Sequence, residues 1–178
     1  MLIVLLGGAR SGKSSLALRL AREQDAPVVF LATGEAGDEE MAARIARHRE
    51  ERPSEWETVE EPLALALAVA KVDPAACLVI DCLSLWSSNR LAHDPPEEIE
   101  AEAAVAARVA HGRTGPTVVV GNEAGLGLVP GTPLGRTWRD LNGRVNAAWV
   151  AEADRAYFVV AGRALALEDA ASILAGDA

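Results

Sequence analysis

Short continuous apolar runs recur along this chain, and between them apolar residues return at every third or fourth position. The first pattern is typical of strands buried on both faces of a parallel sheet. It predicts strands at 2–6, 28–31, 56–59, 77–80, 117–120 and 156–161. The second pattern is typical of helices with one apolar face, and it predicts helices at 14–22, 38–50, 62–71, 95–111 and 134–153. This alternation predicts an α/β fold, in which a mostly parallel sheet has helices on both faces.

Chain length and local signals add to this picture. A chain of 178 residues is long enough for one well-buried α/β domain and short for two, so we expect residues 1–178 to form a single domain. The helix at 95–111 has the clearest start signal. Asp94 stands at its N-cap position, and Glu97, three residues later, completes the spacing of a capping box.

The segment Gly7-Gly-Ala-Arg-Ser-Gly-Lys-Ser14 joins the first predicted strand to the first predicted helix. It matches the P-loop pattern G-x-x-x-x-G-K-[ST], in the strand-loop-helix context that the motif requires. Glycines allow successive backbone N–H groups to turn towards an anion, and the helix N-terminus adds partial positive charge. In this interpretation Lys13 reaches the β- and γ-phosphates of a nucleotide, and Ser14 binds Mg²⁺.

Asp81 directly follows the apolar run at 77–80. An aspartate at the end of a strand beside a P-loop is the Walker-B arrangement, in which the carboxylate holds the metal ion. Such an aspartate can instead be a helix cap or a turn residue. Because the P-loop is present, we favour Asp81 as a second metal-binding residue together with Ser14.

Composition limits the classes of partner. The net charge of −9 and the pI of about 4.8 argue against a general nucleic-acid-binding surface. No apolar run approaches the roughly 20 residues needed to span a bilayer, and the N-terminus lacks a signal-peptide pattern, so we expect a cytoplasmic protein. Cys77 and Cys82 lack the spacing of a zinc site and are interpreted as core residues.

Basic residues gather towards the end of the helix predicted at 38–50. Among them, Arg44, His48 and Arg52 are spaced four residues apart, which would place them on one helix face as an anion-binding stripe. Neighbouring positive charges disfavour the imidazolium, and a neutral imidazole has a lone pair able to attack phosphorus. The alternative is a solvated helix C-terminus, where cations are favoured by the helix dipole. The residues alone leave both interpretations open.

Four segments together make the chain similar to a known family. They are GGARSGKS, the block R-I-x-x-H-R-x-x-R-P-x-x-W-x-T-x-E at 44–60, the strand end VIDCLSLW, and the block N-E-x-G-x-G-x-V-P at 122–130. The chain resembles the bifunctional adenosylcobinamide kinase/adenosylcobinamide-phosphate guanylyltransferase family over nearly its whole length. The resemblance implies a RecA-like P-loop NTPase fold with one antiparallel strand and a trimeric assembly. It also implies phosphorylation of adenosylcobinamide, followed by transfer of GMP from GTP onto that phosphate.

The resemblance further implies roles for individual residues. His48 matches the histidine that carries GMP in the family, which favours the catalytic interpretation of His48. GTP and ATP are the implied nucleotide substrates, Mg²⁺ is the implied cofactor, and the corrinoid is the second substrate. The positions that match GTP-contacting segments are Gly7, Gly8, Ala9, Arg10, Ser11, Gly12, Lys13, Ser14, Ala32, Thr33, Gly34, Arg49, Glu50, Glu51, Arg52, Glu60 and Asp81.

Other residues and functions are weighed against this resemblance. Asn122 and Glu123 follow a predicted strand, at the edge where open α/β sheets bind ligands, and we assign them to the corrinoid side. A regulatory GTP switch would need an N-K-x-D motif, and neither Lys13 nor Lys71 stands in one. The remaining alternative is a small-molecule kinase that uses only the γ-phosphate, which would leave His48 without a chemical task.

Overall fold

A seven-stranded sheet organises residues 1–169, which are the residues that this computed structural model describes, apart from the Arg44 side chain. The strand order is β3-β2-β4-β5-β1-β6-β7. Neighbouring strands are parallel, except for β6 and β7, which are antiparallel. The strands are β1 (Leu2–Gly7), β2 (Val28–Ala32), β3 (Glu57–Glu60), β4 (Cys77–Asp81), β5 (Thr117–Asn122), β6 (Arg155–Val160) and β7 (Arg163–Leu167).

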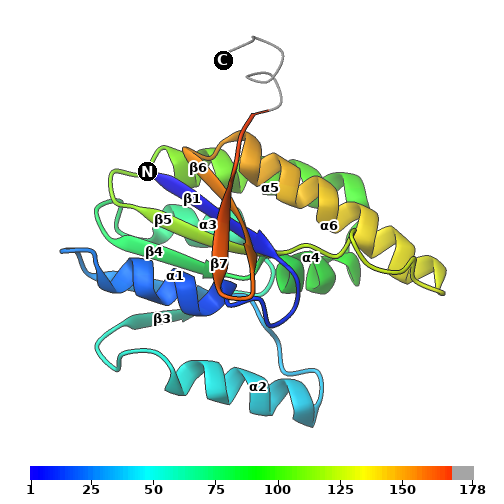
Figure 1. The fold of residues 1–178 in the computed structure, drawn as a ribbon, viewed down its shortest axis with the longest axis horizontal. Helices are drawn as coiled ribbons and strands as arrows, with labels where there is room; N and C mark the ends of the chain where they lie inside the picture. The colour runs from blue at the N-terminus through cyan, green and yellow to red at the C-terminus, as the bar shows by residue number, and fades with distance from the viewer. Residues whose placement is uncertain (170–178) are drawn as a thin grey trace.

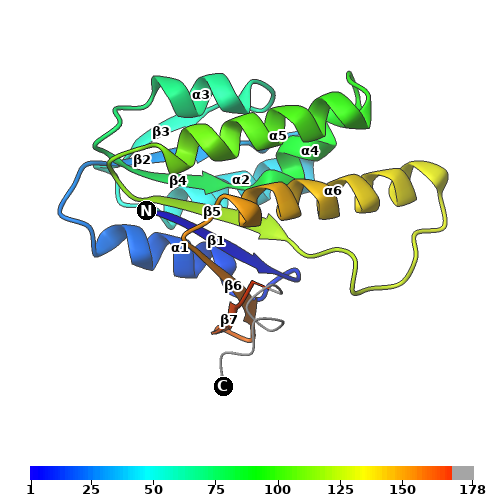
Figure 2. The same cartoon turned by 90° about the horizontal axis from the view of Figure 1, so that it is seen from above.

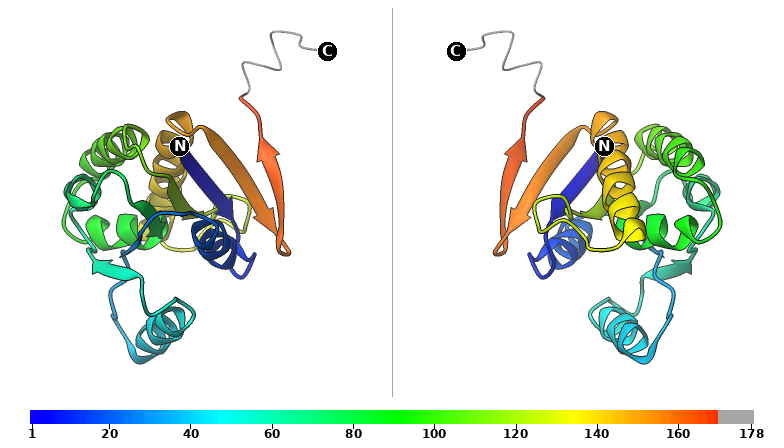
Figure 3. Two further views of the ribbon diagram at one scale, coloured as in Figure 1. Left: turned by 90° about the vertical axis from the view of Figure 1, so that its left-hand side faces the viewer. Right: turned by 90° about the vertical axis from the view of Figure 1, so that its right-hand side faces the viewer.

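Helices cover both faces of this sheet (Figure 1). They are α1 (Lys13–Arg22), α2 (Glu39–Glu50), α3 (Leu65–Lys71), α4 (Leu83–Leu91), α5 (Pro96–His111) and α6 (Pro133–Ala151). One face is covered by α1, which contacts β1, β4 and β5. On the other face α5 packs between α3 and α6 (Figure 2). The α2 helix projects away from the rest of the fold (Figure 3). The predicted α/β class, with a mostly parallel sheet and helices on both faces, is confirmed.

Two apolar layers hold the sheet between the helices, and they explain the continuous apolar runs. All six residues of β1 are buried. Alternate β1 side chains point to opposite faces, so Val4 joins the layer that contains the fully buried Trp86 and Trp149. Leu5 joins the layer under α1, which includes Leu18. A strand that contributes to both layers needs an apolar residue at every position.

The strand order determines which residues meet at the ligand edge. β5 lies between β4, which ends at Asp81, and β1, which leads into the P-loop. In the sheet register Gly7 is opposite Asn122, and Asp81 is opposite Val120. Because parallel strands present their C-terminal ends at one edge, the P-loop and the ends of β4 and β5 lie together there. This is the edge at which open α/β sheets bind ligands.

Two elements were not predicted from the apolar pattern. Helix α4 follows Asp81 directly, and its buried Ser84 and Ser87 interrupt the apolar spacing that marks a helix. Strand β7 is exposed at all five positions, so no burial pattern identifies it. It is nevertheless the antiparallel strand that the family resemblance implied.

The predicted N-cap of α5 is wrong. The residue at the cap is Pro95, and no side chain caps the helix. The Asp94 carboxylate instead accepts a hydrogen bond from Arg90 Nε at 2.6 Å. The Arg90 guanidinium also donates to Glu102 and to the Leu63 carbonyl oxygen, so Asp94 belongs to a network that joins α4 to α5. The Asp94 carboxylate therefore pairs with Arg90 instead of capping the first turn of α5.

None of the helices within residues 1–169 combines the length and the apolar character required to cross a bilayer.

Candidate active site

The P-loop has the backbone geometry of an anion-binding nest. Three of its residues have positive φ angles: Gly7 (154°), Arg10 (56°) and Gly12 (99°). Gly12 is the left-handed N-cap of α1, so the free N–H groups of the first helical turn face the loop. Lys13 is buried, and its ammonium donates to the Gly8 carbonyl oxygen at 2.8 Å. The loop therefore places a lysine and a helix N-terminus at the C-terminal edge of the sheet.

The turn between β6 and β7 holds this loop in place. The Gly162 N–H donates to the Ser11 carbonyl oxygen at 2.8 Å. A Cβ atom added at Gly7 would lie 2.2 Å from the Val159 carbonyl oxygen, and one added at Gly12 would lie 3.3 Å from the Gly162 Cα. Glycine is therefore required at Gly7 for close backbone contact as well as for its φ angle.

Asp81 and Ser14 meet beside the P-loop. The Ser14 hydroxyl hydrogen-bonds to the Asp81 carboxylate, and His48, Arg52 and Lys13 are close enough to favour its charged form. Burial is the larger effect and raises the pKa of Asp81 above its ordinary value. Such a carboxylate gains most from a bound cation. The structure thus brings together the two residues that were predicted to bind the metal.

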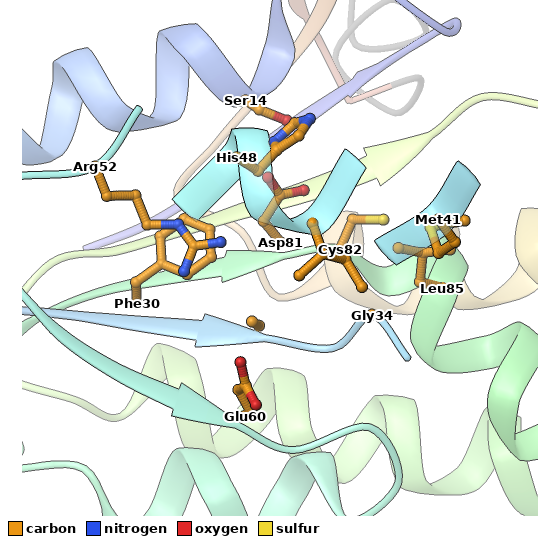
Figure 4. A pocket seen from close by; sticks show the side chains of 12 residues that line it. Ser14, Phe30, Gly34, Met41, His48, Arg52, Glu60, Asp81, Cys82 and Leu85 are labelled. Carbon is orange, nitrogen blue, oxygen red and sulfur yellow. The ribbon is translucent and has the colours of Figure 1, made fainter. Parts of the chain in front are cut away.

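One pocket brings His48 together with six of the predicted nucleotide-binding residues (Figure 4). His48 reaches it from α2, Glu60 from β3 and Asp81 from β4, while Ser14 comes from the start of α1. The rest of its lining is formed by Phe30, Ala32, Gly34, Met41, Ile45, Arg52, Cys82 and Leu85. An imidazole, a guanidinium, a carboxylate and a hydroxyl therefore share one cavity. That combination is suited to holding a triphosphate and attacking it.

Arg52 is positioned differently from the prediction. Helix α2 ends at Glu50, so Arg52 lies beyond the helix and does not continue a stripe through Arg44 and His48. Its guanidinium carbon lies 3.7 Å above the centre of the Phe30 ring. Burial lowers the pKa of Arg52, with Asp81 acting in the opposite direction. An arginine remains charged under such a shift, so Arg52 is a fixed cation in the pocket.

The remaining predicted residues of this segment lie outside the cavity lining. Arg49 forms an ion pair with Glu60, and both side chains are more than half exposed. Such a pair contributes little to stability, about 0–1 kcal/mol, but it orients a carboxylate at the pocket. Glu50 and Glu51 are exposed. Their nucleotide contacts stay a prediction.

Thr33 has a structural task that the sequence did not indicate. It is fully buried, and its hydroxyl donates to the Cys82 carbonyl oxygen at 2.7 Å while accepting from the Cys82 N–H at 2.8 Å. Asn89 of α4 donates to the Thr33 carbonyl oxygen at 2.8 Å. These bonds join the ends of β2 and β4 and fix the backbone that carries Gly34 and Asp81. The only sequence signal was the match of 32–34 to a nucleotide-contacting segment.

Comparison with known proteins gives a consistent set of relatives. A family model described as cobinamide kinase / cobinamide phosphate guanyltransferase matches residues 3–167. The bifunctional adenosylcobalamin biosynthesis protein CobP of Pseudomonas aeruginosa is 43% identical over 166 residues, covering 93% of this chain and 96% of that protein. The bifunctional adenosylcobalamin biosynthesis protein CobU of Escherichia coli is 37% identical over 176 residues, covering 91% of this chain and 97% of that protein.

Among solved structures, the fold is similar to an ATPase from the type III secretion system of pathogenic bacteria. The TM-score is 0.53 at 12% identity, and the match covers 88% of this chain but only 51% of the ATPase chain. The chain thus spans about half of that ATPase, and the likeness shows the fold alone. The family model and the two relatives extend over almost all of the described residues. The chain belongs to the cobinamide kinase / cobinamide phosphate guanyltransferase family.

Proposed function

We propose that this chain phosphorylates a hydroxyl group of adenosylcobinamide and then transfers GMP from GTP onto the new phosphate, giving adenosylcobinamide-GDP. The family description names these two reactions, and the two relatives are named as bifunctional proteins of adenosylcobalamin biosynthesis. One observation carries the proposal at the level of residues. His48 lines the same pocket as Ser14 and Asp81, beside the P-loop. On the resemblance, we also propose a homotrimer in the cytoplasm.

His48 is proposed as the nucleophile of the transfer reaction. A nitrogen of its neutral imidazole attacks the α-phosphorus of GTP, a P–N bond forms, and pyrophosphate leaves with the electrons of the broken P–O bond. The second ring nitrogen gives up its proton. An oxygen of the corrinoid phosphate then attacks the same phosphorus, the P–N bond breaks, and the histidine regains a proton. The covalent intermediate divides one difficult displacement into two easier ones.

Positive charge in the pocket supports this displacement. Arg52 is held over the Phe30 ring and carries a fixed charge next to His48 and Asp81. Lys13 lies in the P-loop and interacts with Asp81 electrostatically. Preorganised cations of this kind stabilise negative charge that develops on the leaving phosphates. GTP, or ATP in the phosphorylation step, is the proposed nucleotide.

The donor set fits Mg²⁺. A hydroxyl and a carboxylate are the hard oxygen ligands that this ion prefers, and Mg²⁺ sites commonly use one or two protein ligands together with substrate phosphates. Within residues 1–169, no group of three or more His, Cys, Asp or Glu residues could hold a metal ion. Ser14 and Asp81 would hold the ion, and the bound ion would neutralise charge on the phosphate oxygens.

Labelling with GTP that carries its label on the α-phosphate tests the proposal. We expect the wild-type chain to acquire a covalent, acid-labile GMP, detected on a denaturing gel and by intact mass. His48→Ala should acquire none. His93→Ala is the matched control, because His93 is exposed and lies outside the pocket lining, and it should label like the wild type.

Absence of label on a wild-type chain that binds GTP would contradict the covalent mechanism. Such a result, with phosphorylation of the corrinoid still present, would favour a P-loop kinase without nucleotidyl transfer. Label on His48→Ala at the wild-type level would move the nucleophile to another residue.

A further inference from the structure

We infer that Glu123 is the catalytic base of the phosphorylation step. This inference rests on the proposed function. The transfer reaction has a proposed nucleophile in His48, whereas the phosphorylation step needs a separate group to take the proton of the corrinoid hydroxyl. When that hydroxyl oxygen attacks the γ-phosphorus, its O–H bond breaks, a new O–P bond forms, and the nucleoside diphosphate leaves with the electrons of the old bond. The proton passes to the Glu123 carboxylate.

Glu123 lies directly against the P-loop. It is the first residue after β5, and its N–H donates to the Gly7 carbonyl oxygen at 2.9 Å. β5 lies between the strand of Asp81 and the strand of the P-loop. Glu123 thus begins the loop that leaves the sheet at the edge where Lys13 and Asp81 are proposed to meet the phosphates. In the sheet, β2 and β3 lie on one side of β4, which ends at Asp81, and β5 lies on the other. Glu123 and the His48 pocket are therefore on opposite sides of Asp81.

Buried polar side chains fix the peptide that precedes Glu123. Asn142 and Asn146 of α6 donate to the Asn122 carbonyl oxygen at 2.8 and 2.9 Å. The Asn122 N–H donates to the Ser84 hydroxyl of α4 at 2.8 Å. Ser84, Asn142 and Asn146 are 2%, 1% and 3% exposed.

Placing such groups in a core is costly, since the side-chain oxygens of Asn142 and Asn146 find no hydrogen-bond partner within residues 1–169. Three polar residues from two helices thus hold the two peptide groups of Asn122 at a defined place. Precise support of this kind is what a catalytic group requires. The sequence predicted a ligand site at Asn122 and Glu123 because they follow a strand. The hydrogen bonds to Asn122 show how the backbone there is fixed.

Glu123 also presents a carboxylate that has no ion pair within residues 1–169. Asp81 is engaged with Ser14 and is the proposed metal ligand. Glu60 is paired with Arg49 on the far side of the His48 pocket. Glu123 is half-buried, and one of its oxygens, Oε1, accepts from the Gly125 N–H at 2.5 Å. Within the described residues the Glu123 carboxylate forms this one hydrogen bond, which orients it and leaves the second oxygen for a substrate proton.

The competing explanation is that Glu123 only caps the loop through the Gly125 N–H. Glu123→Gln separates the two, because the amide keeps an oxygen that can accept this bond but loses the basicity. Phosphorylation is measured as nucleoside diphosphate and corrinoid phosphate released from cobinamide and GTP. Guanylylation is measured separately, without corrinoid, as GMP bound to the chain. Glu152→Gln, at the far end of α6, is the matched control.

We expect Glu123→Gln to lower kcat for phosphorylation by about 10²- to 10⁴-fold, the usual effect of removing a general base, with both KM values within about twofold. GMP binding to the chain should stay within about twofold, and Glu152→Gln should match the wild type in both reactions. Glu123→Asp, which keeps a carboxylate, should be faster than Glu123→Gln.

A kcat for phosphorylation by Glu123→Gln within about threefold of the wild-type value would overturn the inference. Equal losses in phosphorylation and guanylylation would also overturn it, as would a Glu123→Asp variant that phosphorylates more slowly than Glu123→Gln. A wild-type chain that does not phosphorylate cobinamide would overturn the proposed function itself, and the inference with it.

Discussion

Thr33→Val should destabilise the protein out of proportion to its size. The substitution preserves shape but removes the hydroxyl that both donates to and accepts from the Cys82 peptide. The site is fully buried, so the Cys82 N–H group is left without a partner, while the Cys82 carbonyl oxygen still accepts from the Trp86 N–H at 3.2 Å. One buried group left unpaired costs about 1–3 kcal/mol, and this is the predicted loss in the free energy of unfolding.

Thr117→Val is a matched control for this measurement. Thr117 is also fully buried in a strand, but its hydroxyl has no hydrogen-bond partner within residues 1–169. Its removal should change the free energy of unfolding by less than about 0.5 kcal/mol or stabilise the protein, because an unpaired polar group leaves the core. Val also suits a strand.

Urea unfolding followed by circular dichroism measures both changes. With a slope of about 2 kcal/mol per molar urea, Thr33→Val should lower the midpoint by about 0.5–1.5 M, while the Thr117→Val midpoint stays close to that of the wild type. Equal shifts in the two variants, or a loss below about 1 kcal/mol in Thr33→Val, would refute the role of Thr33 in joining β2 to β4.

Two further predictions concern backbone contact and thiol chemistry. Gly7→Ala should lower the free energy of unfolding by more than about 3 kcal/mol, because its Cβ would lie 2.2 Å from the Val159 carbonyl oxygen. Gly8→Ala is the control: its Cβ meets no atom within 4 Å, so it should cost less than about 1 kcal/mol. Thermal unfolding measures both. Burial raises the pKa of Cys77 to about 11 and of Cys82 to about 12, so both thiols stay protonated at pH 8 and should resist iodoacetamide until the chain is unfolded. Both thiols ionise more readily in the unfolded chain, so the free energy of unfolding should fall as pH rises above 9.0. Replacing both cysteines by alanine should reduce that fall, measured as the melting temperature at each pH. Labelling of either thiol in the native chain at pH 8 would contradict the burial.

The apolar pattern was sufficient to predict the elements whose burial is uniform. Strands such as β1 and β4 are apolar at nearly every position, and the P-loop has a local sequence signature. It could not predict β7, which has no buried side chain, or α4, whose buried Ser84 and Ser87 bond to distant or local backbone groups. Polar residues in a core carry no periodic signal, because their partners are set by the tertiary fold.

The candidate site shows the same division. The loop from Gly7 to Ser14, Asp81 and His48 could be chosen from local sequence and resemblance, since each stands in a recognisable block. The position of Arg52 could not, because it depends on where α2 ends and on the Phe30 ring of another strand. The same holds for the hydrogen bonds of Asn142 and Asn146, which link segments about 20 residues apart.

The central place of β1 has a consequence for synthesis of the chain. β1 leads into the P-loop, yet both of its neighbours, β5 (Thr117–Asn122) and β6 (Arg155–Val160), are far later in the sequence. During translation, this strand of six buried residues has no neighbouring strand to pair with until more than a hundred further residues have been made. The P-loop also depends on a late segment, because the Gly162 N–H donates to the Ser11 carbonyl oxygen. A nascent chain therefore exposes this apolar strand until β5 has been made, and the contacts that hold its P-loop form only after Gly162 has been added.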